Sequence, residues 1–139
     1  RIYLDFAKAF DKVPHSRLIR KLQSHGIQGQ VLKWIEGWLK GRKQRVSLNG
    51  RFSKWCEVLS GVPQGSVLGP LLFLIFINDI DDEVISKLCK FADDTKVCRA
   101  VGSEDEVNIL RNDLKNCVNG LRIGKCCLMW ISVLLFTLV

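Results

Sequence analysis

Two adjacent carboxylates, Asp93 and Asp94, are the residues of this chain that first suggest catalytic chemistry. They lie between two segments rich in strand formers, Lys87–Phe91 and Thr95–Cys98, which predicts a β-hairpin with Ala92-Asp93-Asp94 at its tip. Adjacent aspartates on a turn repel each other unless a positive charge neutralises them, and divalent cations prefer carboxylate oxygens. A solvated turn is the alternative, because aspartate is common in turns.

A third carboxylate, Asp5, ends the apolar segment at the start of the chain, where Arg1–Phe6 is predicted to be a buried strand. Alone, it is an ordinary residue at the end of a strand. Carboxylates from separate strands suit metal-assisted phosphoryl transfer, in which two Mg²⁺ ions about 3.5–4 Å apart activate one oxygen and stabilise another.

A loop dense in glycine and proline, Gly61–Pro70, comes before the wholly apolar segment Leu71–Ile77. Glycines in such a loop allow another backbone or a base pair to approach closely. The apolar segment is predicted to be buried on all sides, within a helix over Leu68–Asn78, and it is too short to span a bilayer.

The remaining elements are read from periodicity and from turn residues. The predicted helices are Ser16–Ser24, ended by Gly26; Gln30–Lys40, with Val31, Trp34, Ile35 and Trp38 on one face; and Ser103–Val118, capped by Ser103. A hairpin is predicted from strand Gln44–Leu48, turn Asn49-Gly50 and return strand Phe52–Leu59, and Asn78–Glu83 is an acidic connector.

The net charge of +7 is unevenly distributed: residues 1–58 hold 13 Lys/Arg and 4 Asp/Glu, and residues 59–139 hold 8 and 10. A basic half beside an acidic half suits a bound polyanion on one surface and metal-binding carboxylates on another, whereas a solvated basic face is the alternative. The predicted nucleic-acid contacts are Lys40, Arg42, Lys43 and Arg45. Trp34, Trp38 and Trp55 could stack on bases, but the helical spacing of Trp34 and Trp38 favours a core position.

The six cysteines form no C-x-x-C pair and lie far from His15 and His25 in the sequence. A zinc site is therefore not expected. We interpret the cysteines as reduced thiols of an intracellular protein, in the cytoplasm or the nucleus, since no signal peptide is visible.

Together, three segments resemble motifs A, B and C of reverse transcriptases, and those of non-LTR (LINE-type) retrotransposons in particular. They are Leu4–Asp11, Ser60–Phe73 and Phe91–Asp94, in that order, and the similarity covers Ile2 to Cys117. Motif matches of this kind are hypotheses that need a structural context.

The resemblance implies an α+β polymerase palm, an antiparallel sheet that carries Asp5 and Asp93-Asp94 side by side, with helices packed on one face and the fingers and thumb missing. It implies two Mg²⁺ ions, or Mn²⁺, held by Asp5, Asp93 and Asp94. Phe10 would lie beneath the incoming sugar and select deoxynucleotides, and Gln64 and Gly65 would line the nascent base pair. The partners would be an RNA template, a DNA primer and deoxynucleoside triphosphates, without a membrane.

The chain also departs from the family pattern. Phe91 occupies a position that is often Tyr, and the residues after Lys125 carry no charge. We expect residues 1–122 to be a partial palm domain and residues 123–139 to be a divergent apolar tail, produced by an internal deletion and a frame shift. A non-catalytic retrotransposon remnant that binds nucleic acid is the alternative function.

Overall fold

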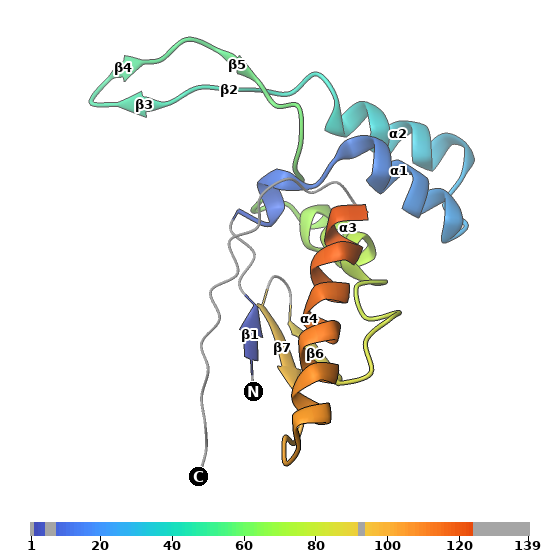
Figure 1. The fold of residues 1–139 in the computed structure, drawn as a ribbon. Helices are drawn as coiled ribbons and strands as arrows, with labels where there is room; N and C mark the ends of the chain where they lie inside the picture. Colours follow the sequence, from blue (N-terminus) through green and yellow to red (C-terminus); the bar gives the residue numbers. More distant parts are fainter. Residues whose placement is uncertain (1, 5–7, 92–93, 124–139) are drawn as a thin grey trace. The chain divides into compact units, whose positions relative to one another are not determined.

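The computed structural model describes residues 2–4, 8–91 and 94–123, with the side chains of residues 118–123 omitted (Figure 1). These residues form four α-helices and three small antiparallel sheets, an α+β fold as predicted. The chain divides into two compact units, Arg1–Ala9 with Phe76–Val139 and Phe10–Ile75, and each is described by itself.

A three-stranded antiparallel sheet is the centre of the first unit. Its strands are β1 (Ile2–Leu4), β6 (Lys87–Phe91) and β7 (Asp94–Cys98), in the order β1-β7-β6. Successive side chains of a strand point to opposite faces, and Ile2, Leu4 and Val97 are buried on one of them. Helix α4 (Glu104–Ile123) lies along the sheet (Figure 1).

Helix α4 joins this core through Cys117, with Leu110 and Leu114 packed beside it. Burial raises the pKa of the Cys117 thiol to about 11, so the thiol is a neutral core group at physiological pH. The helix begins with a reciprocal cap: Ser103 Oγ accepts the Glu106 N–H, and Glu106 Oε2 accepts the Ser103 N–H. The predicted Ser103 cap is confirmed.

The second unit contains α1 (His15–Ser24) and α2 (Gly29–Leu39), which pack against each other. Gly26, at φ +83°, follows α1 as predicted, and Leu18 and Leu22 are buried. The face predicted for α2 is confirmed at Ile35, which is buried, and at Trp38, which is half-buried, but it is wrong at Val31 and Trp34, which are exposed. Leu32 and Leu39 are buried in their place. Trp34 instead stacks on the half-buried Trp38, with ring centroids 6.3 Å apart.

The predicted hairpin is an arm that extends away from α1 and α2 within the second unit (Figure 1). Its strands are short: β2 (Lys43–Gln44), β3 (Ser47–Leu48), β4 (Arg51–Phe52) and β5 (Cys56–Glu57). Asn49 and Gly50 both have positive φ, 48° and 76°, and connect the paired residues Leu48 and Arg51. The Asn-Gly turn is therefore confirmed.

Helix α3 (Leu68–Ile77) forms where a helix was predicted, but it is not buried on all sides. Leu72, Phe73, Phe76 and Ile77 are buried, whereas Leu71 and Leu74 are exposed. An apolar helix has no sequence signal that separates its inner face from its outer face, and the prediction therefore failed there.

No helix of the described part of the chain is long and apolar enough to cross a membrane. Among the described cysteines, Cys56, Cys89, Cys98 and Cys117 are free thiols. The predicted tail falls almost entirely within residues 124–139, outside the described residues.

Candidate functional site

The β6–β7 hairpin and strand β1 bring together the parts of the chain that border the three predicted metal ligands. Phe91 pairs with Asp94, so only residues 92 and 93 connect β6 to β7, and the predicted hairpin is confirmed. On the other side of β7, Leu4 pairs with Thr95. Neighbouring strands lie about 4.8 Å apart. The end of β1 therefore lies beside the start of β7.

Asp94, one of the three predicted ligands, is the exposed first residue of β7. Asp5 directly follows Leu4, and Asp93 directly precedes Asp94, but both lie outside the described residues. Among the residues that the structure does describe, no group of three His, Cys, Asp or Glu side chains is placed to hold a metal ion.

The other end of the hairpin is attached to α4 through the carboxylate of Asp113. Its Oδ1 accepts the Ile85 N–H at 3.0 Å, and its Oδ2 accepts the Ser86 N–H at 2.9 Å and the Ser86 hydroxyl. Burial raises the pKa of Asp113, but these hydrogen bonds outweigh it and hold the pKa below its usual value. Asp113 thus anchors the residues that lead into β6.

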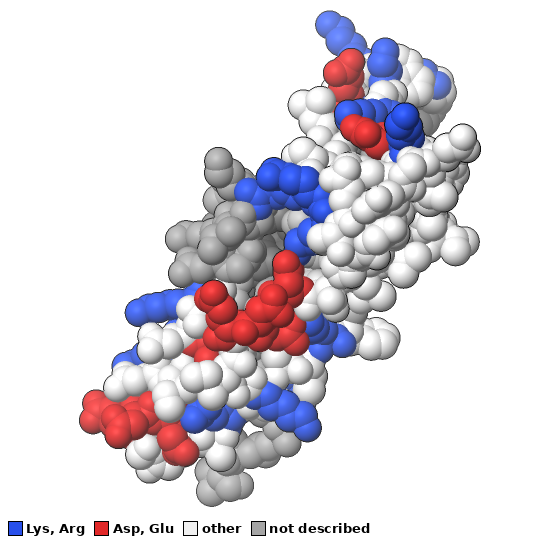
Figure 2. Space-filling view, turned by 90° about the vertical axis from the view of Figure 1, so that its right-hand side faces the viewer, with Lys and Arg blue, Asp and Glu red and all other residues white. Residues whose placement is uncertain are grey.

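Acidic side chains gather into clusters on the face drawn in Figure 2. In the acidic connector, Asp81 pairs with Lys90 of β6 at 2.5 Å. The hydrogen bond from Lys90 lowers the pKa of Asp81. This ion pair holds the connector against the strand that leads to the aspartates.

Phe10, the predicted sugar-facing residue, lies in a short 3-10 helix, η1 (Phe10–Lys12), in the second unit. Its half-buried ring stacks on Phe73 of α3, with centroids 4.6 Å apart and planes inclined by 23°. Its carbonyl accepts the Val62 N–H at 2.7 Å, and Val13 accepts the Gly61 N–H at 2.8 Å. The segment that contains Phe10 therefore pairs directly with the start of the glycine-rich loop.

The glycines of this loop have three different surroundings. A Cβ on Gly61 would lie 2.7 Å from backbone atoms of Phe10 and Asp11, and a Cβ on Gly69 would lie 2.3 Å from the Pro63 carbonyl oxygen. A Cβ on Gly65 would have no neighbouring atom within 4 Å. Gly61 and Gly69 thus allow the loop to pack closely, whereas Gly65 borders open space.

Gln64 and Gly65, the predicted base-pair contacts, are exposed at the outer part of this loop. The loop closes through Ser66, whose hydroxyl donates to the Pro63 carbonyl at 2.7 Å and accepts the Gly69 N–H at 2.9 Å. Ser66 also caps the start of α3 in this way. The cap keeps the two exposed residues on a turn of defined shape.

Arg42 and His15 are two positioning residues that the sequence did not predict as such. Arg42 donates from Nη2 to the Gly61 carbonyl at 2.6 Å and from Nε to the Leu39 carbonyl at 2.9 Å. His15 Nε2 lies 2.9 Å from the Gly61 oxygen and 3.2 Å from Arg42 Nη2. A guanidinium only donates, so Nε2 satisfies one of these contacts at a time.

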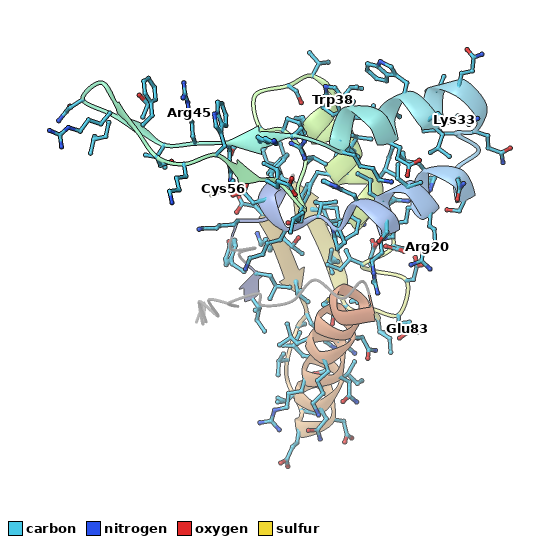
Figure 3. The ribbon with its side chains drawn as sticks, turned by 90° about the horizontal axis from the view of Figure 1, so that it is seen from above. Arg20, Lys33, Trp38, Arg45, Cys56 and Glu83 are labelled. Atoms are coloured by element: carbon cyan, nitrogen blue, oxygen red, sulfur yellow. The ribbon has the colours of Figure 1, made fainter. Side chains whose placement is uncertain are left out.

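The four predicted nucleic-acid residues have different surroundings. Arg42 makes the contacts above, Lys40 pairs with Glu36 at 2.5 Å, and Lys43 is exposed on β2. The Arg45 guanidinium lies over the rings of Phe52 and Trp55. Figure 3 labels Arg45 and Cys56 on the arm. The four nucleic-acid contacts stay predictions.

Comparisons with known proteins agree with the three motifs. Residues 2–129 match the family described as reverse transcriptase (RNA-dependent DNA polymerase). The chain is 35% identical over 101 residues to a probable RNA-directed DNA polymerase from transposon X-element of Drosophila melanogaster, with 69% of the chain and 11% of the relative covered. It is also similar to the RNA-directed DNA polymerase from mobile element jockey of Drosophila funebris, 40% identical over 81 residues, with 58% and 9% covered.

A third relative is the Pol polyprotein from type-1 retrotransposable element R2 of Popillia japonica, 30% identical over 87 residues, with 63% of the chain and 14% of the relative covered. The chain thus spans about a tenth of the length of these curated relatives. The matches confirm the predicted resemblance to reverse transcriptases of non-LTR (LINE-type) retrotransposons.

Proposed function

Because the chain belongs to the reverse transcriptase (RNA-dependent DNA polymerase) family, we propose that it is the catalytic part of an RNA-directed DNA polymerase. It would transfer deoxynucleotides to the 3′-hydroxyl of a DNA primer along an RNA template. The observation that carries this proposal is the register of β1, β7 and β6, which gathers the residues next to the predicted carboxylates at one end of one sheet.

The proposed metal ligands are Asp5, Asp93 and Asp94, with Asp94 a third carboxylate. The donor chemistry fits Mg²⁺, a hard cation that prefers oxygen ligands, and Mn²⁺ accepts the same ligands. The pairing of Leu4 with Thr95 supports a metal site shared by Asp5 and Asp93. Leu4 directly precedes Asp5, and Thr95 follows Asp93 by two residues. When bound, two such ions activate the attacking oxygen and stabilise the leaving one.

The second unit would supply the residues that face the nucleotide. The stacking of Phe10 on Phe73 fixes an aromatic ring, which supports a role in leaving no room for a 2′-hydroxyl. Exposed Gln64 and open Gly65 support contacts with the nascent base pair. A palm-type fold is proposed for the first unit, and its antiparallel sheet with helix α4 packed on it supports this.

Primer extension on an RNA template tests this proposal. We expect the chain to incorporate deoxynucleotides with Mg²⁺, and we expect Asp93→Asn to reduce incorporation to background because the variant loses a charged ligand. Asp82→Asn, in the exposed acidic connector, is the matched control and should retain activity. A wild-type chain that binds RNA in a salt-sensitive manner but incorporates nothing would instead support a binding remnant.

A further inference from the structure

We propose that the arm, residues 43–57, binds single-stranded RNA by stacking bases on Phe52 and Trp55 beside the Arg45 guanidinium. This inference rests on the proposed function, which supplies an RNA template. It adds a contact surface on an element that carries none of the proposed metal ligands or nucleotide-facing residues.

The three side chains form one preassembled cluster. The guanidinium carbon of Arg45 lies 3.9 Å from the Phe52 ring centroid and 4.5 Å from the Trp55 ring centroid. Phe52 and Trp55 are each 58% exposed. The cation therefore covers part of each ring, and more than half of each aromatic side chain stays open to solvent.

A bulge in the arm explains why these residues meet. Gln44 pairs with Cys56, and Ser47 pairs with Phe52. Between these pairs, the two residues 45–46 lie opposite the three residues 53–55. An extra residue reverses the alternation of the strand that contains it. It brings Trp55 to the face that carries Arg45 and Phe52, and Ser53 closes the gap through hydrogen bonds with Val46.

The charge of the arm favours a polyanion over an acidic or apolar protein partner. Residues 43–57 carry four Lys/Arg and one Asp/Glu. Aromatic rings interleaved with cations are the arrangement that binds single strands, because every base has a face to stack and every phosphate has a charge to neutralise. An acidic peptide would use the cations but not the open rings.

Anisotropy of a labelled oligouridylate measures binding to the whole chain. We expect Trp55→Ala and Phe52→Ala to weaken binding by about tenfold each, as loss of one stacked base predicts. We expect Arg45→Ala to weaken binding as well and to reduce the slope of log K against log salt by about 0.7, the value for one phosphate contact on a single strand.

Val46→Ala and Leu48→Ala are the matched controls. These exposed apolar residues alternate with Arg45 and Ser47 and so belong to the other face of the arm. We expect both to leave the affinity within twofold. Trp34 is an exposed tryptophan of α2, and Trp34→Ala should also leave the RNA affinity unchanged. Circular dichroism should show that all variants are folded.

Three outcomes would overturn the inference: affinity unchanged in Trp55→Ala and Phe52→Ala, equal affinity for duplex RNA, or equal competition by polyglutamate. Quenching of tryptophan fluorescence by oligouridylate that disappears in Trp55→Ala would support it. Asp93→Asn separates this inference from the proposed function. If the chain binds RNA through the arm but does not extend a primer, only the proposed function is overturned. If the chain extends a primer but the arm variants do not change its RNA affinity, only the proposal for the arm is overturned.

Discussion

At the scale of single residues, Arg42 and Lys43 are adjacent cations with different roles in the fold. Arg42 bridges the carbonyls of Leu39 and Gly61, whereas Lys43 is exposed. We expect Arg42→Ala to lower the free energy of unfolding by about 1.5–3 kcal/mol, because hydrogen bonds from a charged group are lost. Arg42→Lys should recover little, since an ammonium cannot span both carbonyls.

Urea denaturation measures this difference, and Lys43→Ala is the matched control that removes the same charge. We expect the control to change the free energy of unfolding by less than about 0.5 kcal/mol. Equal effects of the two alanine variants would show that Arg42 acts as a surface charge and does not brace the loop.

Asp113 is a second residue whose contribution to stability can be measured, because that contribution depends on pH. Its folded-state pKa lies below its usual value, so its stabilising contribution is present above the unfolded pKa of about 4 and is lost as pH falls through the folded pKa. We expect Asp113→Asn to be less stable than the wild type at pH 7, since an amide has one acceptor oxygen for the Ile85 and Ser86 donors.

Urea denaturation of both proteins at pH 7 and in acid tests this expectation. The difference in free energy of unfolding should be full at pH 7 and should shrink below about pH 4. A difference that does not change with pH would mean that the charge of Asp113 contributes nothing to the anchor.

At the scale of elements, the glycine-rich loop depends on two glycines in different ways. Gly61 and Gly65 both have positive φ, 89° and 85°, but only Gly61 has backbone atoms where a Cβ would lie. We expect Gly65→Ala to cost about 1 kcal/mol of stability, for the left-handed conformation alone. Gly61→Ala should cost about 2 kcal/mol or more, because the loop must also move away from Phe10.

Thermal denaturation of the two variants measures this contrast. Equal losses of stability in Gly61→Ala and Gly65→Ala would mean that the close approach of the loop to Phe10 and Asp11 is not maintained in solution.

The elements that the sequence predicted well are those with local signals. The Asn49-Gly50 turn, the Ser103 cap and the hairpin on both sides of Asp93 depend on residues close together in the chain. The buried face of α2 was predicted only in part, and that of α3 was predicted wrongly. Apolar residues surround much of each helix, so only the packing partner decides which side is covered.

The candidate site likewise combines residues that local motifs predict with contacts between residues far apart in the sequence. The carboxylates and the loop residues are predicted from motifs, whereas the contacts of Arg42 and His15 with Gly61 join residues 19 and 46 positions apart. No periodicity or turn signal connects positions at that separation. The cluster of Arg45 with Phe52 and Trp55 also depends on a bulge that the alternating pattern does not reveal.

At the scale of the whole molecule, the chain divides into two compact units, and each carries different residues of the proposed function. The first unit contains the sheet next to the proposed metal ligands, and the second contains Phe10, the glycine-rich loop and the arm. The part of the chain that matches the X-element relative covers 11% of that relative's length.

Asp5 and Asp93 are proposed to hold a metal ion together at one end of the sheet. Mn²⁺ broadens NMR signals of nearby nuclei, and the amides of Leu4 and Thr95 are paired residues on each side of the proposed ligands. We expect substoichiometric Mn²⁺ to broaden the signals of both amides before others. We expect Asp93→Asn to abolish this broadening and Asp82→Asn to leave it unchanged. Signals of Leu4 and Thr95 that broaden no earlier than those of the arm, or that broaden equally in Asp93→Asn, would contradict this proposal.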